Sequence, residues 1–315
     1  GFCVAKAGDV NGDGFDDIIV GSPFNSIPGT YAGRAFLYYG GLVMSSTPSL
    51  IFSGEASGDM FGGAVSGAGD VNGDGYDDII IGSPYNSNKG KIYLYYGGPG
   101  LNNSYDASVL GSSAGDWFGV SAACAGDVNG DGLSDFIVGA NGNDAAANNA
   151  GAAYLFYGRT SLNYSSSLTL TGTDAGDAFG SVVSSGGDVN GDGYSDVLVS
   201  AFLNDAGGID AGRVYCYFGG ASMNNVVDVT FTGQAGADEF GRGINSTGDV
   251  NGDSYSDIII GAPNSDGGAT NAGRVYIYYG GSSVDNTADK TITSTYANTN
   301  FGYSVAGIGD VNGDA

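Results

Sequence analysis

The string Gly-Asp-Val-Asn-Gly-Asp occurs six times in the 315-residue chain, and this repetition constrains the fold more than any other feature. The first Asp of the copies stands at positions 9, 70, 127, 188, 249 and 310, so neighbouring copies lie 57 or 61 residues apart. One supersecondary unit has been copied, and such units bury a core by stacking on their neighbours. We expect complete repeats over residues 1–61, 62–118, 119–179, 180–240 and 241–301, and a partial repeat over 302–315.

Four strand-like segments recur in every unit. The first is short and rich in Gly, Ala and Val, as in residues 62–67, and it leads into the Asp-rich string. The second is an uninterrupted apolar run, such as the Ile run at 79–81, which is typical of a strand covered on both faces. The third places aromatic residues such as Tyr93 and Tyr95 at alternate positions, where we expect core packing, with a platform for a glycan as the alternative. The fourth is a weaker strand, as in residues 107–110.

No segment shows the sustained 3.6-residue period of a helix, so the chain is predicted to be all-β. Four antiparallel strands per unit predict a β-propeller of four-stranded blades, with five full repeats and the start of a sixth. A β-helix is the structural alternative, although its repeats are usually shorter. Residues 301–314 repeat the register of residues 1–13, which predicts a partial or open ring or an array completed by another chain.

The charge balance excludes some partners. The chain has 34 acidic and 9 basic residues and a formal net charge of -25, so a phosphate backbone would be repelled and nucleic acid is excluded. No apolar run approaches the roughly 18 residues that span a bilayer, so no membrane insertion is expected within the chain. His is absent, which removes the usual general base, and the chain is predicted not to be an enzyme.

Each repeated string opens a nine-residue loop with oxygen side chains at positions 1, 3, 5 and 9, which are Asp9, Asn11, Asp13 and Asp17 in the first copy. Calcium takes roughly six to eight oxygen ligands, and side chains that alternate along a tight loop can converge on one ion. Position 7 holds a side chain that cannot ligate, such as Phe15, so its backbone carbonyl is the expected donor. The sequence therefore predicts about one Ca²⁺ per complete repeat.

The predicted ligands are the residues at positions 1, 3, 5, 7 and 9 of the five complete loops. They are Asp9, Asn11, Asp13, Phe15 and Asp17; Asp70, Asn72, Asp74, Tyr76 and Asp78; Asp127, Asn129, Asp131, Leu133 and Asp135; Asp188, Asn190, Asp192, Tyr194 and Asp196; and Asp249, Asn251, Asp253, Tyr255 and Asp257. Position 12 is Val or Ile and not the Glu of an EF-hand, so each loop is expected to open into a strand.

Position 6 distinguishes the fifth loop from the others. It is Gly in four loops, which fits a sharp turn with φ above zero, and Ser254 in the fifth. A non-Gly residue in that conformation costs on the order of 1 kcal/mol. The fifth loop is therefore expected to bind calcium more weakly than the others.

Four basic residues also recur at one position of the repeat. Arg34, Lys91, Arg213 and Arg274 stand at the start of the third strand. Because the position recurs, we predict a structural ion pair or a contact at the rim, with a binding patch as the alternative.

Two further motifs frame each loop. The pair Phe-Gly begins at residues 61, 118, 179, 240 and 301, and Gly-Ala-Pro stands at 261–263, with altered forms such as Gly-Ser-Pro at 82–84. With the loop between them, these motifs resemble the FG-GAP repeats of integrin α-subunit propellers and of related bacterial and eukaryotic extracellular proteins. The resemblance covers essentially the whole chain. It implies a propeller, commonly seven-bladed, with calcium at one rim and partner binding on the other face.

The same resemblance implies an extracellular or cell-surface location and an adhesion or ligand-binding scaffold whose partner is a protein or a glycan. One alternative is a self-assembling protein of a fibre or surface layer, in which further copies of the chain pair at open propeller edges. Another is a catalytic or non-catalytic part of a polysaccharide-active protein, because Asp pairs can act on glycosides.

Overall fold

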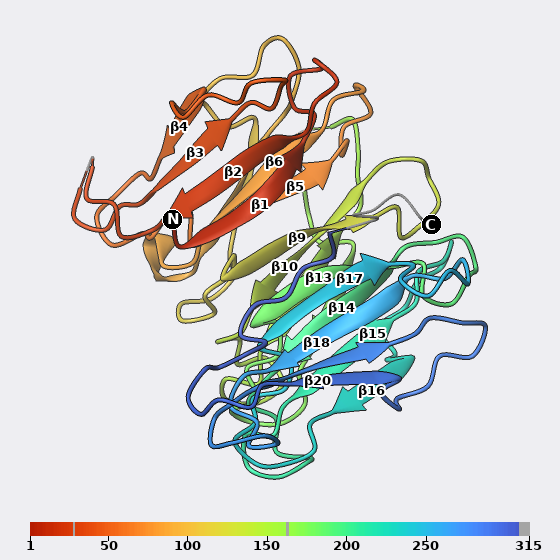
Figure 1. The fold of residues 1–315 in the computed structure, drawn as a ribbon. Coiled ribbons are helices and arrows are strands. Elements are labelled where there is room, and N and C mark those ends of the chain that lie inside the picture. Colours follow the sequence, from red (N-terminus) through yellow and green to blue (C-terminus); the bar gives the residue numbers. More distant parts are fainter. Residues whose placement is uncertain (28, 162–163, 309–315) are drawn as a thin grey trace. The chain divides into compact units, whose positions relative to one another are not determined.

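The computed structural model describes residues 1–27, 29–161 and 164–308 (Figure 1). Strands dominate these residues, and the single helical element among them is the 3-10 turn η1 (Asn86–Asn88). The all-β prediction is therefore confirmed. The last Gly-Asp-Val-Asn-Gly-Asp string, with Asp310, lies outside the described residues. Within them, no helix has the length and apolar character that crossing a membrane requires.

In the described ranges the strands form five four-stranded antiparallel sheets, each made of strands that follow one another in the chain. Their bounds are β1 Cys3–Gly8, β2 Asp17–Ser22, β3 Arg34–Tyr38 and β4 Leu50–Ser53; β5 Ala64–Gly69, β6 Asp78–Ser83, β7 Lys91–Tyr95 and β8 Ala107–Leu110; β9 Ser121–Gly126, β10 Asp135–Ala140, β11 Ala152–Phe156 and β12 Leu168–Thr171; β13 Val182–Gly187, β14 Asp196–Ala201, β15 Arg213–Tyr217 and β16 Val229–Thr232; β17 Gly243–Gly248, β18 Asp257–Ala262, β19 Arg274–Tyr278 and β20 Lys290–Thr293. The predicted four strands per repeat are confirmed, and the sheets are consistent with propeller blades.

The chain divides into two compact units. The first contains Gly1–Cys124, Gly132–Asp144 and Ala152–Leu170, and therefore the first two sheets and most of the third. The second contains Ala125–Asp131, Ala145–Gly151 and the chain from Thr171 onward, with the fourth and fifth sheets.

The first strand of each sheet begins later than the sequence predicted. β5 covers Ala64–Gly69, whereas the prediction was residues 62–67. Its pairing with β6 changes register between Gly67 and Gly69, and Gly69 has a φ of 71°. Glycine adopts this left-handed conformation at little cost, so the strand continues through a bulge to the loop. The same register shift occurs in β1, β13 and β17.

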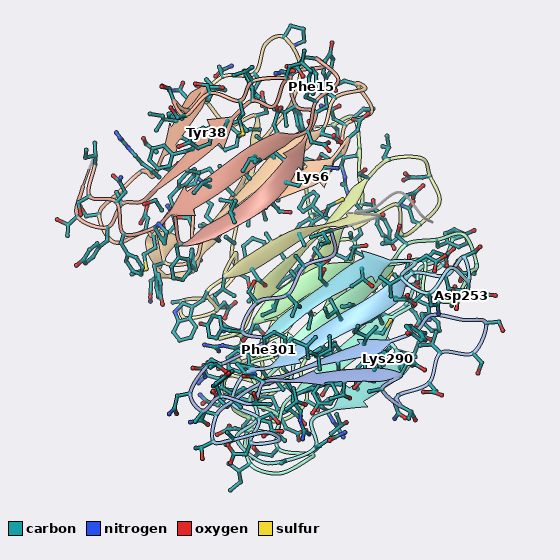
Figure 2. All side chains as sticks on the ribbon, in the orientation of Figure 1. Lys6, Phe15, Tyr38, Asp253, Lys290 and Phe301 are labelled. Carbon is teal, nitrogen blue, oxygen red and sulfur yellow. The ribbon has the colours of Figure 1, made fainter. Side chains whose placement is uncertain are left out.

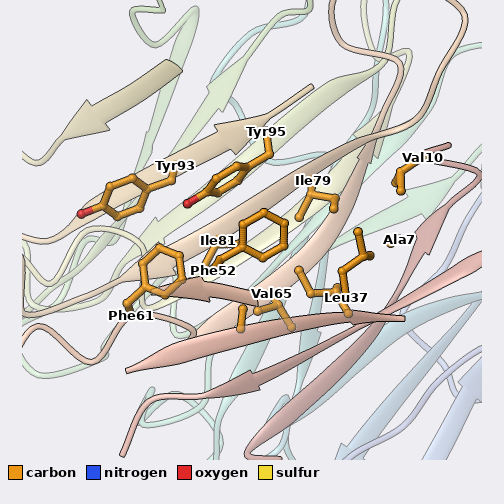
Figure 3. Packing of buried hydrophobic residues seen from close by; sticks show 12 residues of the cluster. Ala7, Val10, Leu37, Phe52, Phe61, Val65, Ile79, Ile81, Tyr93 and Tyr95 are labelled. Carbon is orange, nitrogen blue, oxygen red and sulfur yellow. The ribbon is translucent and has the colours of Figure 1, made fainter. Parts of the chain in front are cut away.

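Aromatic side chains join each sheet to the next within a unit. In the first unit, the ring centroid of Phe52 on β4 lies 4.4 Å from that of Tyr95 on β7, and Phe61 lies 5.1 Å from Tyr93 (Figure 3). In the second unit, Phe231 lies 4.4 Å from Tyr278 in the same arrangement. All of these rings are buried. The predicted core role of the aromatic columns is therefore confirmed.

The Phe-Gly pair is the point where the backbone passes from one sheet to the next. The amide of Phe61 donates to the carbonyl of Ala32 in the first repeat at 3.0 Å, and the amide of Gly62 donates to Gly82 in the second at 2.9 Å. Gly62 has a φ of 81°, and a Cβ there would lie 2.4 Å from the carbonyl oxygen of Arg34. Only glycine fits this position, because it needs both positive φ and a close approach of backbones.

We expect Phe52→Ala to destabilise the first unit by about 3 to 5 kcal/mol, because it opens a cavity between two sheets. Phe24→Ala is the control, since Phe24 lies in the turn after β2 of the same repeat and is 53% exposed. It should cost less than about 1 kcal/mol. Urea denaturation followed by intrinsic fluorescence would measure both, and equal costs would contradict the packing role of Phe52.

Candidate metal-binding loops

Each Asp-rich loop connects the first and second strands of its sheet, and position 9 is the first residue of the second strand. The prediction that the loop opens into a strand is therefore confirmed. Phe15 lies in the loop of the first repeat and Asp253 in that of the fifth (Figure 2). Two glycines give the loop its tight turn, because Gly12 and Gly14 have φ of 75° and 86°.

Side chains at positions 1, 3 and 5 of the first loop are joined by hydrogen bonds. The Oδ1 atom of Asp9 accepts from the amides of Gly12 (2.8 Å) and Asp13 (3.0 Å), and its Oδ2 atom accepts from Gly14 (2.8 Å). The Oδ1 atom of Asn11 accepts from the amide of Asp13 at 2.8 Å, and its Nδ2 donates to Oδ2 of Asp13 at 3.0 Å. The loops that begin at Asp70, Asp188 and Asp249 repeat this pattern.

The carboxylate at position 9 is held differently, inside the sheet. Asp17 is fully buried, and its two oxygens accept from the amides of Val10 (3.0 Å) and Gly40 (2.7 Å). It therefore ties the loop to the end of β3. Burial is the main cause that raises the pKa of the corresponding Asp78 and Asp196 to about 7, against the lowering effect of two backbone amides.

The structure brings together part of each predicted ligand set. Positions 1, 3 and 5 lie around one exposed turn, whereas position 9 points into the sheet. In the described part of the chain, no group of three or more His, Cys, Asp or Glu side chains is arranged to hold a metal ion. The donors nevertheless fit calcium chemically, because all are oxygens and a carboxylate oxygen that accepts one hydrogen bond, such as Oδ2 of Asp9, keeps a free lone pair.

Each of the first four loops also packs against the loop of the following repeat. In the first unit, the carbonyl of Val10 accepts from the amide of Gly98 at 2.8 Å, and that of Asp9 accepts from Asp77 at 3.4 Å. A Cβ on Gly12 would lie 2.4 Å from the ring of Tyr76, so position 7 covers the preceding loop. Sequence reasoning missed this role, although a large side chain at position 7 and Gly at position 4 recur in all five loops. The equivalent contacts are those of Leu133 with Gly73, Tyr194 with Gly130 and Tyr255 with Gly191.

A second column of buried carboxylates, which sequence reasoning also missed, lies where the Phe-Gly pair enters the next sheet. Asp59 is 5% exposed, and its Oδ2 atom accepts from Nδ2 of Asn86 at 2.9 Å. Burial raises the pKa of Asp59. The signal was an Asp two residues before four of the five Phe-Gly pairs, with an Asn 27 positions later in three of these four cases and Ser265 in the other. The same partnership joins Asp116 with Asn143 and Asp177 with Asn204.

The four basic residues that recur at the start of the third strand lie close to this column of carboxylates. The predicted ion pair forms in the second repeat, where Nζ of Lys91 lies 2.9 Å from Oε1 of Glu55. Arg213 instead donates from Nε to Oγ1 of Thr232 at 3.2 Å. The Nε atom is buried without a hydrogen-bond partner in the two remaining cases, Arg34 and Arg274. In the described residues an ion pair is therefore present at one of the four positions, where Glu55 supplies the acidic side chain, so the prediction that the pair recurs is wrong.

The repeat pattern matches the family model of the FG-GAP repeat at residues 5–38, 61–95, 119–156, 179–217 and 240–278. The chain belongs to the FG-GAP repeat family. It is 33% identical to integrin alpha-5 of Xenopus laevis over 178 residues, which is 53% of this chain and 16% of that protein. It is 34% identical to integrin alpha pat-2 of Caenorhabditis briggsae over 221 residues, or 62% of this chain and 17% of that protein.

A third relative, integrin alpha-8 of Gallus gallus, is 28% identical over 234 residues, or 70% of this chain and 21% of that protein. The matched regions of this FG-GAP chain thus span about a fifth or less of the length of these integrin relatives. The family match runs through the loop of every complete repeat.

The fifth loop of this FG-GAP chain is strained as predicted, because Ser254 has a φ of 75°. We expect Ser254→Gly to stabilise the second unit by about 1 kcal/mol. The matched control is Gly193→Ser in the fourth loop, where φ is 90° and no atom lies within 4 Å of a new Cβ, so only backbone strain changes. It should destabilise by a similar amount. Chemical denaturation would measure both, and changes of the same sign would contradict the argument.

The buried carboxylates predict a dependence of stability on pH in the calcium-free protein. The pKa values of Asp78 and Asp196 are raised to about 7, so between about pH 4 and 7 the folded state binds more protons than the unfolded state. Stability should therefore fall as pH rises through this range and then level off. Thermal midpoints measured in chelator would test this, with Asp78→Asn as the control that removes its own share. A midpoint that rises from pH 5 to 7 would contradict the prediction.

Proposed function

We propose that this FG-GAP chain is a calcium-stabilised extracellular scaffold for adhesion or ligand binding, and that it is not an enzyme. The observation that carries the proposal is that the same oxygen-rich turn recurs in the complete repeats and that the first four of these turns bond to the next repeat. The carbonyls of Asp9, Asp70, Asp127 and Asp188 all accept an amide proton from the following loop. Similarity to integrin α subunits supports the adhesion assignment.

In this proposal, the oxygens at positions 1, 3, 5 and 9 and the carbonyl at position 7 hold one Ca²⁺ in each loop. The ion supplies positive charge that offsets three carboxylates. The loop's own residues hold its shape. The glycines at positions 4 and 6 allow the tight turn, and the carboxylate at position 9 anchors the loop to the sheet. Because loops bond to their successors, an ordered loop also orders the neighbouring sheet.

The compartment in which such a site is occupied follows from its calcium affinity. Extracellular calcium modules bind at roughly 10⁻⁴ to 10⁻³ M, so at millimolar calcium each site contributes about 0.5 to 1.5 kcal/mol. Five sites together contribute roughly 2 to 7 kcal/mol, a sizeable part of a typical folding free energy of about 5 to 15 kcal/mol. These magnitudes support an extracellular or cell-surface location, where calcium is abundant.

Removal of calcium is the direct test. We expect chelator to lower the thermal midpoint clearly, because several carboxylates crowd each loop without a counter-ion. Asp13→Asn should reduce the calcium-dependent part of the shift. Asp16→Asn is the matched control from the same loop, since Asp16 stands at position 8 and pairs with Lys6 at 2.9 Å on the surface. Coincident melts with and without chelator, or equal effects of the two variants, would refute calcium stabilisation.

The adhesion assignment needs a second measurement. Surfaces coated with the protein should capture cells or matrix proteins in calcium, and less in chelator. Electron microscopy of the same samples separates the alternatives, because single particles support a binding scaffold and ordered fibres support a self-assembling structural protein.

A further inference from the structure

The first unit contains a cavity of about 490 Å³ between the end of the first repeat and the second sheet. Its lining includes Ser53 of β4 and the neighbouring Glu55. It also includes Tyr93 and Tyr95 of β7, and Asn103 and Tyr105 from the connection between β7 and β8. Pockets of roughly 300 to 1,000 Å³ hold small ligands. The lining is unusual in having no aliphatic side chain.

Two lining residues depart from the repeat, and they meet at this cavity. Tyr105 stands directly before Asp106, whose carboxylate accepts a hydrogen bond from a backbone amide. Asp228 and Asp289 accept the same bond in other repeats, and the residues before them are not aromatic. Glu55 follows the Gly that ends the fourth strand, where other repeats have Ser112, Thr173 and Gln234. The repeat folds without either residue elsewhere, so folding alone does not explain why both occur at one cavity.

The electrostatics of the cavity favour an uncharged ligand. Oε1 of Glu55 is paired with Nζ of Lys91 at 2.9 Å, and Oε2 lies 3.2 Å from Nδ2 of Asn86. The same Nζ atom lies 4.5 Å and 5.0 Å from the ring centroids of Tyr93 and Tyr105. A ligand cation would have to displace Lys91, and the net charge of -25 disfavours an anion. The fixed carboxylate still has lone pairs to accept hydrogen bonds from hydroxyl groups.

The tyrosines supply the remaining surface. Tyr105 is 44% exposed, and its ring lies 5.2 Å from the buried ring of Tyr93. Tyr93 and Tyr95 project from the same strand with their hydroxyls toward the same side (Figure 3). In the described residues, nothing hydrogen-bonds to the hydroxyl of Tyr95, which lines the cavity. An aromatic face next to carboxylate, amide and hydroxyl groups matches a molecule with an apolar face and a hydroxylated edge.

We propose that this cavity binds a neutral saccharide of one or two rings. The C–H face of a sugar ring packs on Tyr105, and its hydroxyls donate to the carboxylate of Glu55 and bond to Asn103 and the hydroxyl of Tyr95. The site lies apart from the calcium loops and goes beyond their proposed role. It gives the junction of the first and second repeats a recognition function beyond folding.

The test is to probe the full chain, in calcium, against an array of neutral, acidic and amine-bearing oligosaccharides and an oligo-arginine peptide. We expect binding to a neutral saccharide, followed by titration calorimetry on the best one. Tyr105→Ala and Glu55→Gln should each weaken binding at least tenfold. The control is Tyr85→Ala, since Tyr85 is similarly exposed at 42% but packs on Trp117 outside the cavity, and it should leave affinity unchanged.

Thermal melts of every variant would show whether a variant that no longer binds is still folded. If Tyr105→Ala is unstable, the affinity of Glu55→Gln provides the test instead. Absence of neutral saccharide binding at millimolar concentration overturns the proposal. So does binding only to charged glycans or the peptide, or neutral binding that Tyr105→Ala leaves intact. A chelator melt without effect would refute calcium stabilisation alone and would leave this result standing.

Discussion

The structure depends on backbone hydrogen bonds that pass from each repeat to the next. Phe61 bonds to the first repeat through its amide, whereas the adjacent Gly62 bonds to the second. The ring of Phe61, like the amide of Gly62, contacts the second sheet, where it packs on Tyr93. A single four-stranded sheet of this kind cannot bury its apolar faces alone, so each repeat is stable only beside another. The Phe-Gly pair that characterises the family is the residue pair that makes this transfer.

Acidic residues occupy two places at each junction, where one repeat meets the next, and their role differs between the two places. At the loops, three oxygen side chains gather at an exposed turn, and a fourth carboxylate such as Asp17 is buried and bonded to backbone amides. Near the Phe-Gly pair, Asp59 and its equivalents are buried against amide side chains. The high negative charge is therefore partly structural. Burial raises the pKa of several of these carboxylates, so the binding of protons affects the junctions.

A repeated structure also makes its exceptions easy to find. Most side chains of the first and second repeats have counterparts elsewhere in the chain, and their roles in folding are shared. Glu55 and Tyr105 have none, and both line one cavity beside Lys91. Ser254 is an exception of another kind, because it places a non-Gly residue at positive φ and weakens its own turn. Departures that converge in space indicate recognition, whereas an isolated departure indicates local strain.

The number of strands in each repeat, the aromatic core columns and the oxygen-rich loops could be predicted from the sequence, because they follow from local periodicity and turn chemistry. Which groups meet across a junction became visible only in the folded structure. Tyr76 covers the loop of the preceding repeat, and Asp59 bonds to Asn86 in the next sheet. The cavity of Glu55 and Tyr105 exists for the same reason. Such contacts depend on how two sheets pack, and packing brings together residues whose spacing along the chain carries no local signal.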